Sequence, residues 1–187
     1  MSNISVDDRH PPLLFLGSFI RTPFERRDRF DRYLREGFVV ADIGAGAGYY
    51  TFHAARKVGE NGLVYAIESN PRALPLLERK AERLGCRNVR IVVSSAASMD
   101  AIPSRSVDFV ISNLTLCCLV DHAGAVNEMR RIMKDGALAY VSVTRMGLSS
   151  DPRRVNEKEF EQLISSFTVK ERKIGKFILS AIVRKDG

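Results

Sequence analysis

The chain has 187 residues, 45% of them hydrophobic, and a formal net charge of +7. This length and apolar content suit one domain with a buried core, so we expect residues 1–187 to fold as a single domain. No apolar run approaches the ~20 residues that a membrane span needs, and the apolar stretch at residues 11–20 lacks the basic leader of a signal peptide, so we expect neither a membrane span nor export.

The three cysteines agree with a reducing compartment. Cys86, Cys117 and Cys118 show no disulfide-framework spacing, and neighbouring cysteines rarely bridge each other. We therefore expect a cytoplasmic protein. The positive charge is spread over predicted helix faces and the C-terminal end, which favours a solvated surface. Nucleic acid is the less favoured partner class.

Residues 1–36 come first and lie outside the pattern that follows. Their stretch FIRTPFERRDRFDRYL mixes aromatic and arginine residues, and the segment is too apolar for a free tail. We expect one or two helices here that form a lid over the acceptor site. Packing against an outer helix face is the alternative.

From residue 38 onward, short β-rich apolar runs alternate with segments of helical spacing. Runs such as FVVADI and DFVISN are apolar almost throughout, as strands covered on both faces are. The alternation predicts a parallel, doubly wound α/β sheet. Pro71 is expected to start one helix, and Gly85 and Gly136 to end two. The predicted strands span residues 38–43, 63–67, 89–93, 107–112 and 137–143, and the predicted helices 49–58, 71–84, 123–133 and 156–167.

The end of the chain departs from this alternation. Two strands are predicted over residues 168–175 and 177–184, with too little chain between them for a crossover helix. The junction must be a hairpin, so we expect the sheet to end in an antiparallel strand.

The first predicted strand ends in the most informative motif of the chain, VADIGAGAGYY. Asp42 stands at the strand end, Gly44, Gly46 and Gly48 follow, and then a helix begins. In an open parallel sheet, ligands bind beyond the carboxyl ends of the strands, and the first strand usually feeds that crevice. Glycine lets the backbone turn sharply there and lets a ligand come close.

Two further residues favour an adenosine ligand over a dinucleotide. A dinucleotide motif that starts at Gly44 needs a third glycine at position 49, where this chain has Tyr49. Glu68 ends the second predicted strand, where a carboxylate can accept hydrogen bonds from both hydroxyls of a ribose. The pattern therefore argues against a nicotinamide-dependent oxidoreductase.

With these motifs, residues 38–144 resemble a class I S-adenosylmethionine-dependent methyltransferase, particularly the small-molecule group similar to the ubiquinone and menaquinone-biosynthesis (type 11) enzymes. The family's acidic-x-Gly-x-Gly-x-Gly motif is complete, and the stretch from VDFVISNLTLCCL to NEMRRIMKDGALAYVSV matches its later segment, with Ala137 replacing the second glycine of K-x-G-G. The resemblance implies a Rossmann-like, mostly parallel seven-stranded sheet of order 3-2-1-4-5-7-6, with the last strand antiparallel and helices on both faces.

The resemblance also implies which residues hold S-adenosylmethionine, the expected cofactor. The loop from Asp42 to Gly46 would hold the methionine part, Glu68 would grip the ribose, and Ser69 would lie beside the adenine. The whole expected cofactor site consists of Asp42, Gly44, Ala45, Gly46, Gly48, Glu68, Ser69, Ala96, Ala97 and Asn113.

The chain departs from the family at two places. Many relatives have an acidic residue after the third strand that binds the adenine amino group, whereas this chain reads SSAAS, with Ala96 at that place. We expect backbone groups at Ala96 and Ala97, or the hydroxyl of Ser95 or Ser98, to replace it. At the end of the fourth predicted strand, the sequence at Asn113 lacks the N/D-P-P-Y tetrapeptide of amino-group methyltransferases. This lack disfavours DNA adenine or protein glutamine methylation. The alternative to a place in the cofactor site is that Asn113 caps the strand end.

Methyl transfer from a cationic sulfur needs alignment of the acceptor and exclusion of water more than it needs an acid or a metal. The absence of a catalytic triad is thus no objection, and three scattered histidines predict no metal site. We expect transfer to a small-molecule acceptor and assign no catalytic residue. The alternatives are a tRNA or rRNA methyltransferase, favoured by the sequence pI near 9.6, and a catalytically silent cofactor-binding protein.

Overall fold

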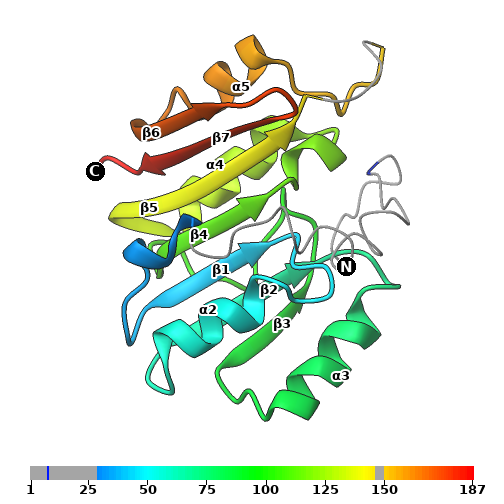
Figure 1. Cartoon of the computed structure of the whole chain (residues 1–187), viewed down its shortest axis with the longest axis vertical. Coiled ribbons are helices and arrows are strands. Elements are labelled where there is room, and N and C mark those ends of the chain that lie inside the picture. The colour runs from blue at the N-terminus through cyan, green and yellow to red at the C-terminus, as the bar shows by residue number, and fades with distance from the viewer. Residues whose placement is uncertain (1–7, 9–28, 146–149) are drawn as a thin grey trace.

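A single seven-stranded sheet organises the chain. The computed structural model describes residue 8, residues 29–145 and residues 150–187, and its strand order is β3-β2-β1-β4-β5-β7-β6 (Figure 1). β1 to β5 pair in parallel, and β7 pairs antiparallel with both β5 and β6. This confirms the predicted doubly wound fold and its antiparallel end. The strands are β1 (Val39–Ile43), β2 (Leu63–Glu68), β3 (Val89–Val93), β4 (Val107–Asn113), β5 (Met133–Thr144), β6 (Thr168–Ile174) and β7 (Ile178–Arg184).

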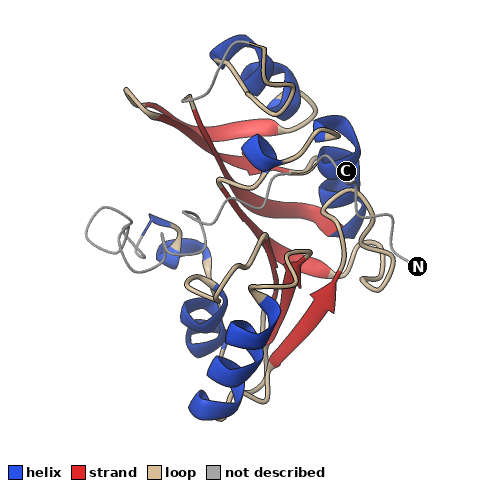
Figure 2. Cartoon of the chain, turned by 90° about the vertical axis from the view of Figure 1, so that its right-hand side faces the viewer, coloured by secondary structure: helices blue, strands red, loops and turns tan. Residues whose placement is uncertain are grey.

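Helices cover both faces of the sheet (Figure 2). Successive side chains of a strand point to opposite faces, so Ala66 of β2 packs with Phe52 and Leu77 on one face, whereas Ile67 joins Met129 and Phe160 in the core of the other. The first face carries α2 (Thr51–Val58) and α3 (Leu74–Leu84), and the second carries α4 (His122–Ile132) and α5 (Glu157–Ile164). Two short 3-10 helices complete the described elements, η2 (Asp31–Tyr33) and η3 (Leu116–Cys118).

Residues 29–36 lie against the face that α2 covers. Phe30 is fully buried there, with ring centroids 5.4, 5.8 and 5.5 Å from those of Tyr50, Phe109 and Tyr140. Asp31 holds this segment to α2 through His53, at 2.5 Å. Residues 1–7 and 9–28, which make up most of the segment expected to form a lid, lie outside the described residues, so the lid stays a prediction.

Two details of the predicted elements are wrong. Residues 71–73 form turns, and α3 begins at Leu74 with Pro75 in its first turn, so Pro75 has the role expected of Pro71. Gly136 does not end a helix. It lies inside β5 at φ +79°, where its N–H donates to the Lys185 carbonyl at 2.8 Å. The chain passes from α4 into extended backbone at Met133 without a left-handed residue, and Gly136 instead lies where the β4–β5 pairing is irregular.

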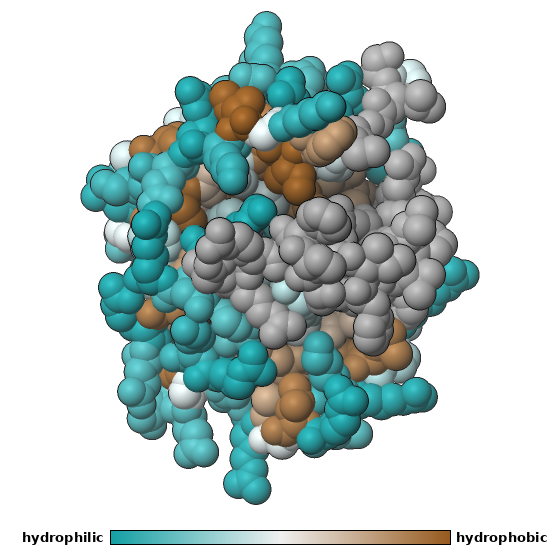
Figure 3. All heavy atoms as spheres, in the orientation of Figure 1, coloured by the Kyte–Doolittle hydropathy of each residue, from teal (hydrophilic) through white to brown (hydrophobic). Residues whose placement is uncertain are grey.

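The described residues on the face seen in Figure 3 are largely hydrophilic. Figure 3 shows teal side chains over much of one face, with brown apolar patches between them. Among the described residues, no helix has the length and apolar character that a membrane crossing requires. Of the described residues, the large apolar side chains that are exposed are Leu76, Leu84, Val93, Val120, Val169, Ile174 and Phe177.

Candidate cofactor site

The predicted site residues gather at one edge of the sheet. β3, β2, β1 and β4 are neighbours and run parallel, so their carboxyl ends lie side by side (Figure 1). The loops that leave these four ends contain the predicted residues that the strands themselves do not. The fold therefore brings all ten together at the edge where open parallel sheets bind ligands.

The first and last glycines of the loop after β1 are needed because a side chain would not fit there. Gly44, at φ +75°, approaches Thr115 so closely that an added Cβ would lie 2.4 Å from its Oγ1. Gly48, at φ +77°, packs against α2 and α3, and an added Cβ would lie 2.3 Å from a ring carbon of Phe52. Both positions are closed by the protein's own atoms.

Gly46 is the open position of the same loop. Its φ is +54°, and an added Cβ would meet no atom of the described residues within 4 Å. The loop is tied to β2 on its other side, because the N–H groups of Gly44 and Ala45 both donate to the Ile67 carbonyl at 2.9 Å. A ligand can therefore approach the backbone at Gly46 without displacing a side chain of this loop.

Glu68 joins the two neighbouring strand ends. Its side chain is buried, with Oε2 accepting from the Gly46 N–H at 2.7 Å and Oε1 from the N–H groups of Ser69 and Asn70 at 2.9 and 2.7 Å. A carboxylate has about four acceptor positions, so these three donors leave one on Oε2. Ser69 follows directly and is half-buried at the same edge.

Asp42 lies beneath the loop and is 2% exposed. The pKa of its carboxyl group is raised to about 7, mainly because burial penalises the charged form. The hydrogen bond from Thr51 Oγ1 at 2.6 Å partly offsets this increase, and the negative charge of Glu68 adds to it. The site thus holds two buried carboxyl groups in one small region. A cation near them would lower the cost of ionising Asp42.

The turn after β3 presents hydroxyl and backbone groups. Ala96 is buried, and the Ala97 N–H donates to Ser95 Oγ at 3.3 Å. Ser98 closes the turn with an N–H bond to the Ser95 carbonyl at 3.1 Å. Ser94 is 6% exposed, yet its hydroxyl has no hydrogen-bond partner among the residues that the structure describes. A buried hydroxyl without a partner is costly unless a ligand or water satisfies it.

Asn113 ends β4 and is held from β5. Its Oδ1 accepts from Ser142 Oγ at 2.9 Å. The next residue, Leu114, has φ +58°, which a non-glycine residue rarely adopts. The Leu114 N–H is bound by both oxygens of Ser142, at 3.0 and 3.2 Å. Ser142 of the neighbouring strand β5 therefore fixes the backbone at the entrance to η3.

Two threonines of the site were not predicted from the sequence. Thr51 begins α2 and binds Asp42, and a small hydroxyl residue at a helix start after a glycine loop is a signal that could have identified it. Thr115 donates to the Ile43 carbonyl at 2.6 Å and fills the space in front of Gly44. It lies 72 residues from its partner, and no local pattern indicates that contact.

The residues present fit S-adenosylmethionine. The open backbone at Gly46 and the remaining acceptor position of Glu68 suit a polar ligand at the ends of β1 and β2. The buried carboxyl group of Asp42 suits the positive charge of the cofactor. The unpartnered hydroxyl of Ser94 offers a donor and acceptor beside the turn where adenine is expected.

Comparison with known proteins points to one family. A family model described as a methyltransferase domain matches residues 34–185. The chain is 34% identical over 104 residues to aklanonic acid methyltransferase DauC of Streptomyces sp. strain C5, covering 55% of this chain and 47% of that protein. It is 28% identical over 122 residues to demethylmenaquinone methyltransferase of Geobacillus stearothermophilus, covering 65% and 52%. The chain thus spans about half the length of these curated relatives.

A solved structure agrees on the fold. The crystal structure of a SAM dependent methyltransferase from Aquifex aeolicus matches with a TM-score of 0.70 over 95% of this chain and 94% of that chain, at 24% sequence identity. The part of the chain that the structure describes therefore has the same fold as that protein.

Proposed function

The chain belongs to the methyltransferase-domain family, among the class I S-adenosylmethionine-dependent methyltransferases of the small-molecule type, and on this basis we propose that it transfers a methyl group from S-adenosylmethionine to a small-molecule acceptor. One observation carries the proposal. The glycine loop is tied to Glu68 through the Gly46 N–H, while no atom of the described residues lies within 4 Å of the place where a Cβ of residue 46 would stand. This is a backbone prepared for close contact with a ligand.

Glu68 binds one ribose hydroxyl in this proposal. Three backbone donors occupy three of about four acceptor positions of its carboxylate. Contact with both hydroxyls would require the Gly46 N–H to leave Oε2. Those backbone bonds also fix the rotamer of the side chain, so its orientation is set before the ligand arrives.

The other predicted residues take positions around the same ligand. Asp42, when it ionises at pH values above about 7, places negative charge under the glycine loop, which favours the cationic end of the cofactor. The adenine lies between Ser69 and the turn after β3, where Ala96 leaves space and the Ala97 backbone and the Ser94 hydroxyl offer hydrogen bonds. Asn113 stands at the acceptor side of the site.

The chemistry of the bound cofactor is the donation of a methyl group from a positively charged sulfur by direct displacement. The contribution of the chain is to orient the two reactants and to exclude water. The rigid backbone between Asn113 and Thr115 can provide that orientation, since β5 and β1 both bind it.

A small-molecule acceptor is supported by the names of the relatives. Both DauC and the Geobacillus protein are named as methyltransferases of small organic molecules. The net charge of +7 is the feature that favours RNA instead.

Methyl-labelled S-adenosylmethionine distinguishes these acceptors. The full chain is incubated with the labelled cofactor and either an organic-phase metabolite extract or total transfer RNA. We expect label in the organic extract, and an Asp42→Asn, Glu68→Gln double variant should transfer none. Label that enters only the RNA would reject the small-molecule assignment.

A further inference from the structure

The chain between β3 and β4 has no helix to hold its shape. Residues 94–106 are all described, and they form turns and bends. This segment begins with the Ser95–Ser98 turn that the proposed function assigns to adenine. Something outside the segment must therefore fix the turn.

Met99 is the point where the segment is fixed. Its side chain is fully buried in the core, its N–H donates to Glu128 Oε2 at 2.7 Å, and its carbonyl accepts from Arg131 at 2.9 Å. Both backbone groups of the residue that follows the turn are thus bound by side chains of α4. Because Met99 is the next residue after Ser98, a shift at Met99 moves the turn.

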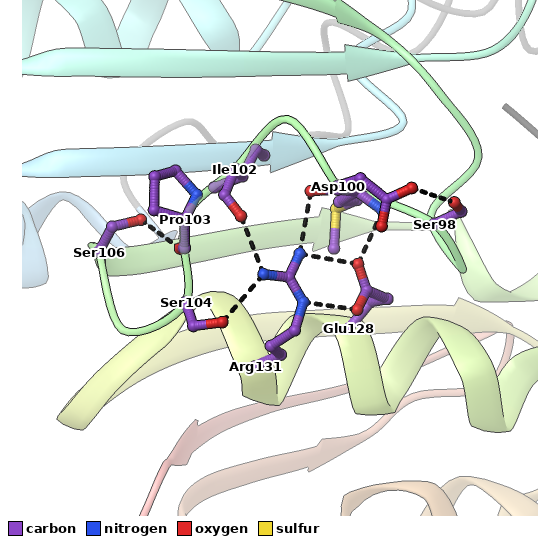
Figure 4. A network of polar contacts seen from close by, with 9 residues as sticks. Ser98, Asp100, Ile102, Pro103, Ser104, Ser106, Glu128 and Arg131 are labelled. Carbon is purple, nitrogen blue, oxygen red and sulfur yellow. Dashed lines mark hydrogen bonds and ion pairs between the residues drawn. The ribbon is translucent and has the colours of Figure 1, made fainter. Parts of the chain in front are cut away.

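Arg131 is the centre of this network (Figure 4). Besides Met99, its guanidinium donates to the Ile102 carbonyl at 2.9 Å and to Ser104 Oγ at 3.1 Å. It also pairs with Glu128 through two bonds of 2.6 and 2.9 Å. The Arg131 guanidinium holds the pKa of Glu128 below its usual range, so the pair is charged at neutral pH. The planar fork of arginine makes these bonds simultaneously, and a lysine ammonium cannot.

We infer that Arg131 is a positioning residue for adenine recognition, which holds the Ser95–Ser98 turn in place by anchoring Met99 and Ile102 from α4. The inference rests on the proposed function. It explains how a turn without an acidic side chain at Ala96 can still recognise a base, since backbone and hydroxyl groups recognise a ligand only when their positions are fixed. Arg131 acts through this turn and touches no reacting atom.

Arg130 provides a matched control on the same helix. It is also half-buried, but it faces the other way, with its guanidinium bound to the Ser166 carbonyl and 5.2 Å from the centroid of the Phe167 ring. Arg130→Lys and Arg131→Lys therefore make the same chemical change at adjacent positions, and only the second removes contacts to Met99 and Ile102, which hold the adenine turn.

The test compares the affinity of the full chain and both variants for S-adenosylhomocysteine and for S-ribosylhomocysteine, which lacks the adenine. We expect Arg131→Lys to weaken S-adenosylhomocysteine about 10-fold, as mutations that act through a positioning network do. Its affinity for S-ribosylhomocysteine should stay within about 2-fold of wild type, and Arg130→Lys should change neither ligand. Hydrogen exchange at the Ser98 and Met99 amides should become faster in Arg131→Lys alone.

The outcomes separate the two proposals. If wild-type protein does not bind S-adenosylhomocysteine, the proposed function fails and this inference fails with it. If wild type binds and Arg131→Lys binds equally well, the positioning role alone is overturned. An equal loss for both ligands in Arg131→Lys would show a general loss of structure and would also overturn it. Glu128→Gln, which keeps the shape of the side chain, gives a milder second variant. It should also weaken binding of S-adenosylhomocysteine more than binding of S-ribosylhomocysteine.

Discussion

Asp42→Asn should stabilise the protein at neutral and alkaline pH while it impairs the cofactor site. Asp42 is 2% exposed, and its pKa rises from an ordinary 3.8 to about 7 because burial penalises the charged form. Each pKa unit corresponds to ~1.4 kcal/mol, so ionising this carboxyl group in the folded protein costs up to about 4 kcal/mol. Asparagine has the same shape and can still accept the bond from Thr51, but it does not ionise.

The sign of the pH dependence follows from the protons bound. Between pH 3.8 and about 7, the folded protein keeps a proton on Asp42 that the unfolded chain has lost. The folded state therefore binds more protons, and stability falls as pH rises through this window. Wild type should lose stability relative to Asp42→Asn from pH 4 upward, until the variant is more stable by about 2 to 4 kcal/mol at pH 8.

Urea unfolding between pH 4.5 and 8.5 at constant ionic strength measures this difference through the unfolding midpoints. Thr51→Val gives a second check, since it removes the hydrogen bond that lowers the pKa of Asp42. The pH range over which stability falls should therefore extend to higher pH in this variant. Parallel stability profiles for wild type and Asp42→Asn would refute the reasoning. The cationic cofactor favours ionised Asp42, so wild-type affinity for S-adenosylmethionine should also rise with pH through about 7, and that rise should vanish in Asp42→Asn.

Three further predictions test the site and the core. Gly46→Ala and Gly85→Ala both place a Cβ at positive φ where no described atom lies within 4 Å, so each should lose about 1 kcal/mol of stability. Calorimetry should show weaker S-adenosylhomocysteine binding for Gly46→Ala alone. Equal affinity in the two variants would show that the ligand does not bind at the glycine loop. Glu68→Gln replaces an acceptor with a donor beside three N–H groups, and it should weaken S-adenosylhomocysteine by about 2 kcal/mol, roughly 30-fold; wild-type affinity by the same titration would remove Glu68 from the site. Phe30→Ala should lower the free energy of unfolding by about 3 to 5 kcal/mol because the ring is fully buried, whereas Phe177→Ala, at a position 56% exposed, should change it by less than about 0.5 kcal/mol; equal urea midpoints for these two variants would contradict the packing of residues 29–36.

The fold was predictable because its signals are local. Each strand of the parallel part is an apolar run, and the short link between β6 and β7 permits only a hairpin. The errors came where two local signals compete. Pro71 and Pro75 both suit a helix start, and the chain uses Pro75. Gly136 suits a helix end, but Met133 turns directly into the strand, so the glycine serves the irregular pairing of β4 and β5.

The site was predictable only where one segment carries the whole pattern. The glycine loop and Glu68 each lie at a strand end that the sequence marks. Thr115 and Arg131 could not be found in this way, because their partners lie 72 residues away at Ile43 and 32 residues away at Met99. Contacts over such separations depend on the strand order, which the sequence pattern does not encode by itself.

Titration calorimetry of the full chain with S-adenosylhomocysteine measures cofactor binding directly. We expect one binding site per chain, and a ligand concentration 100 times the dissociation constant should stabilise the fold by about 2.7 kcal/mol, with a matching rise in Tm. NAD should give neither heat nor a shift in Tm, since Tyr49 stands where a dinucleotide motif needs glycine. Binding of NAD without binding of S-adenosylhomocysteine would contradict the account.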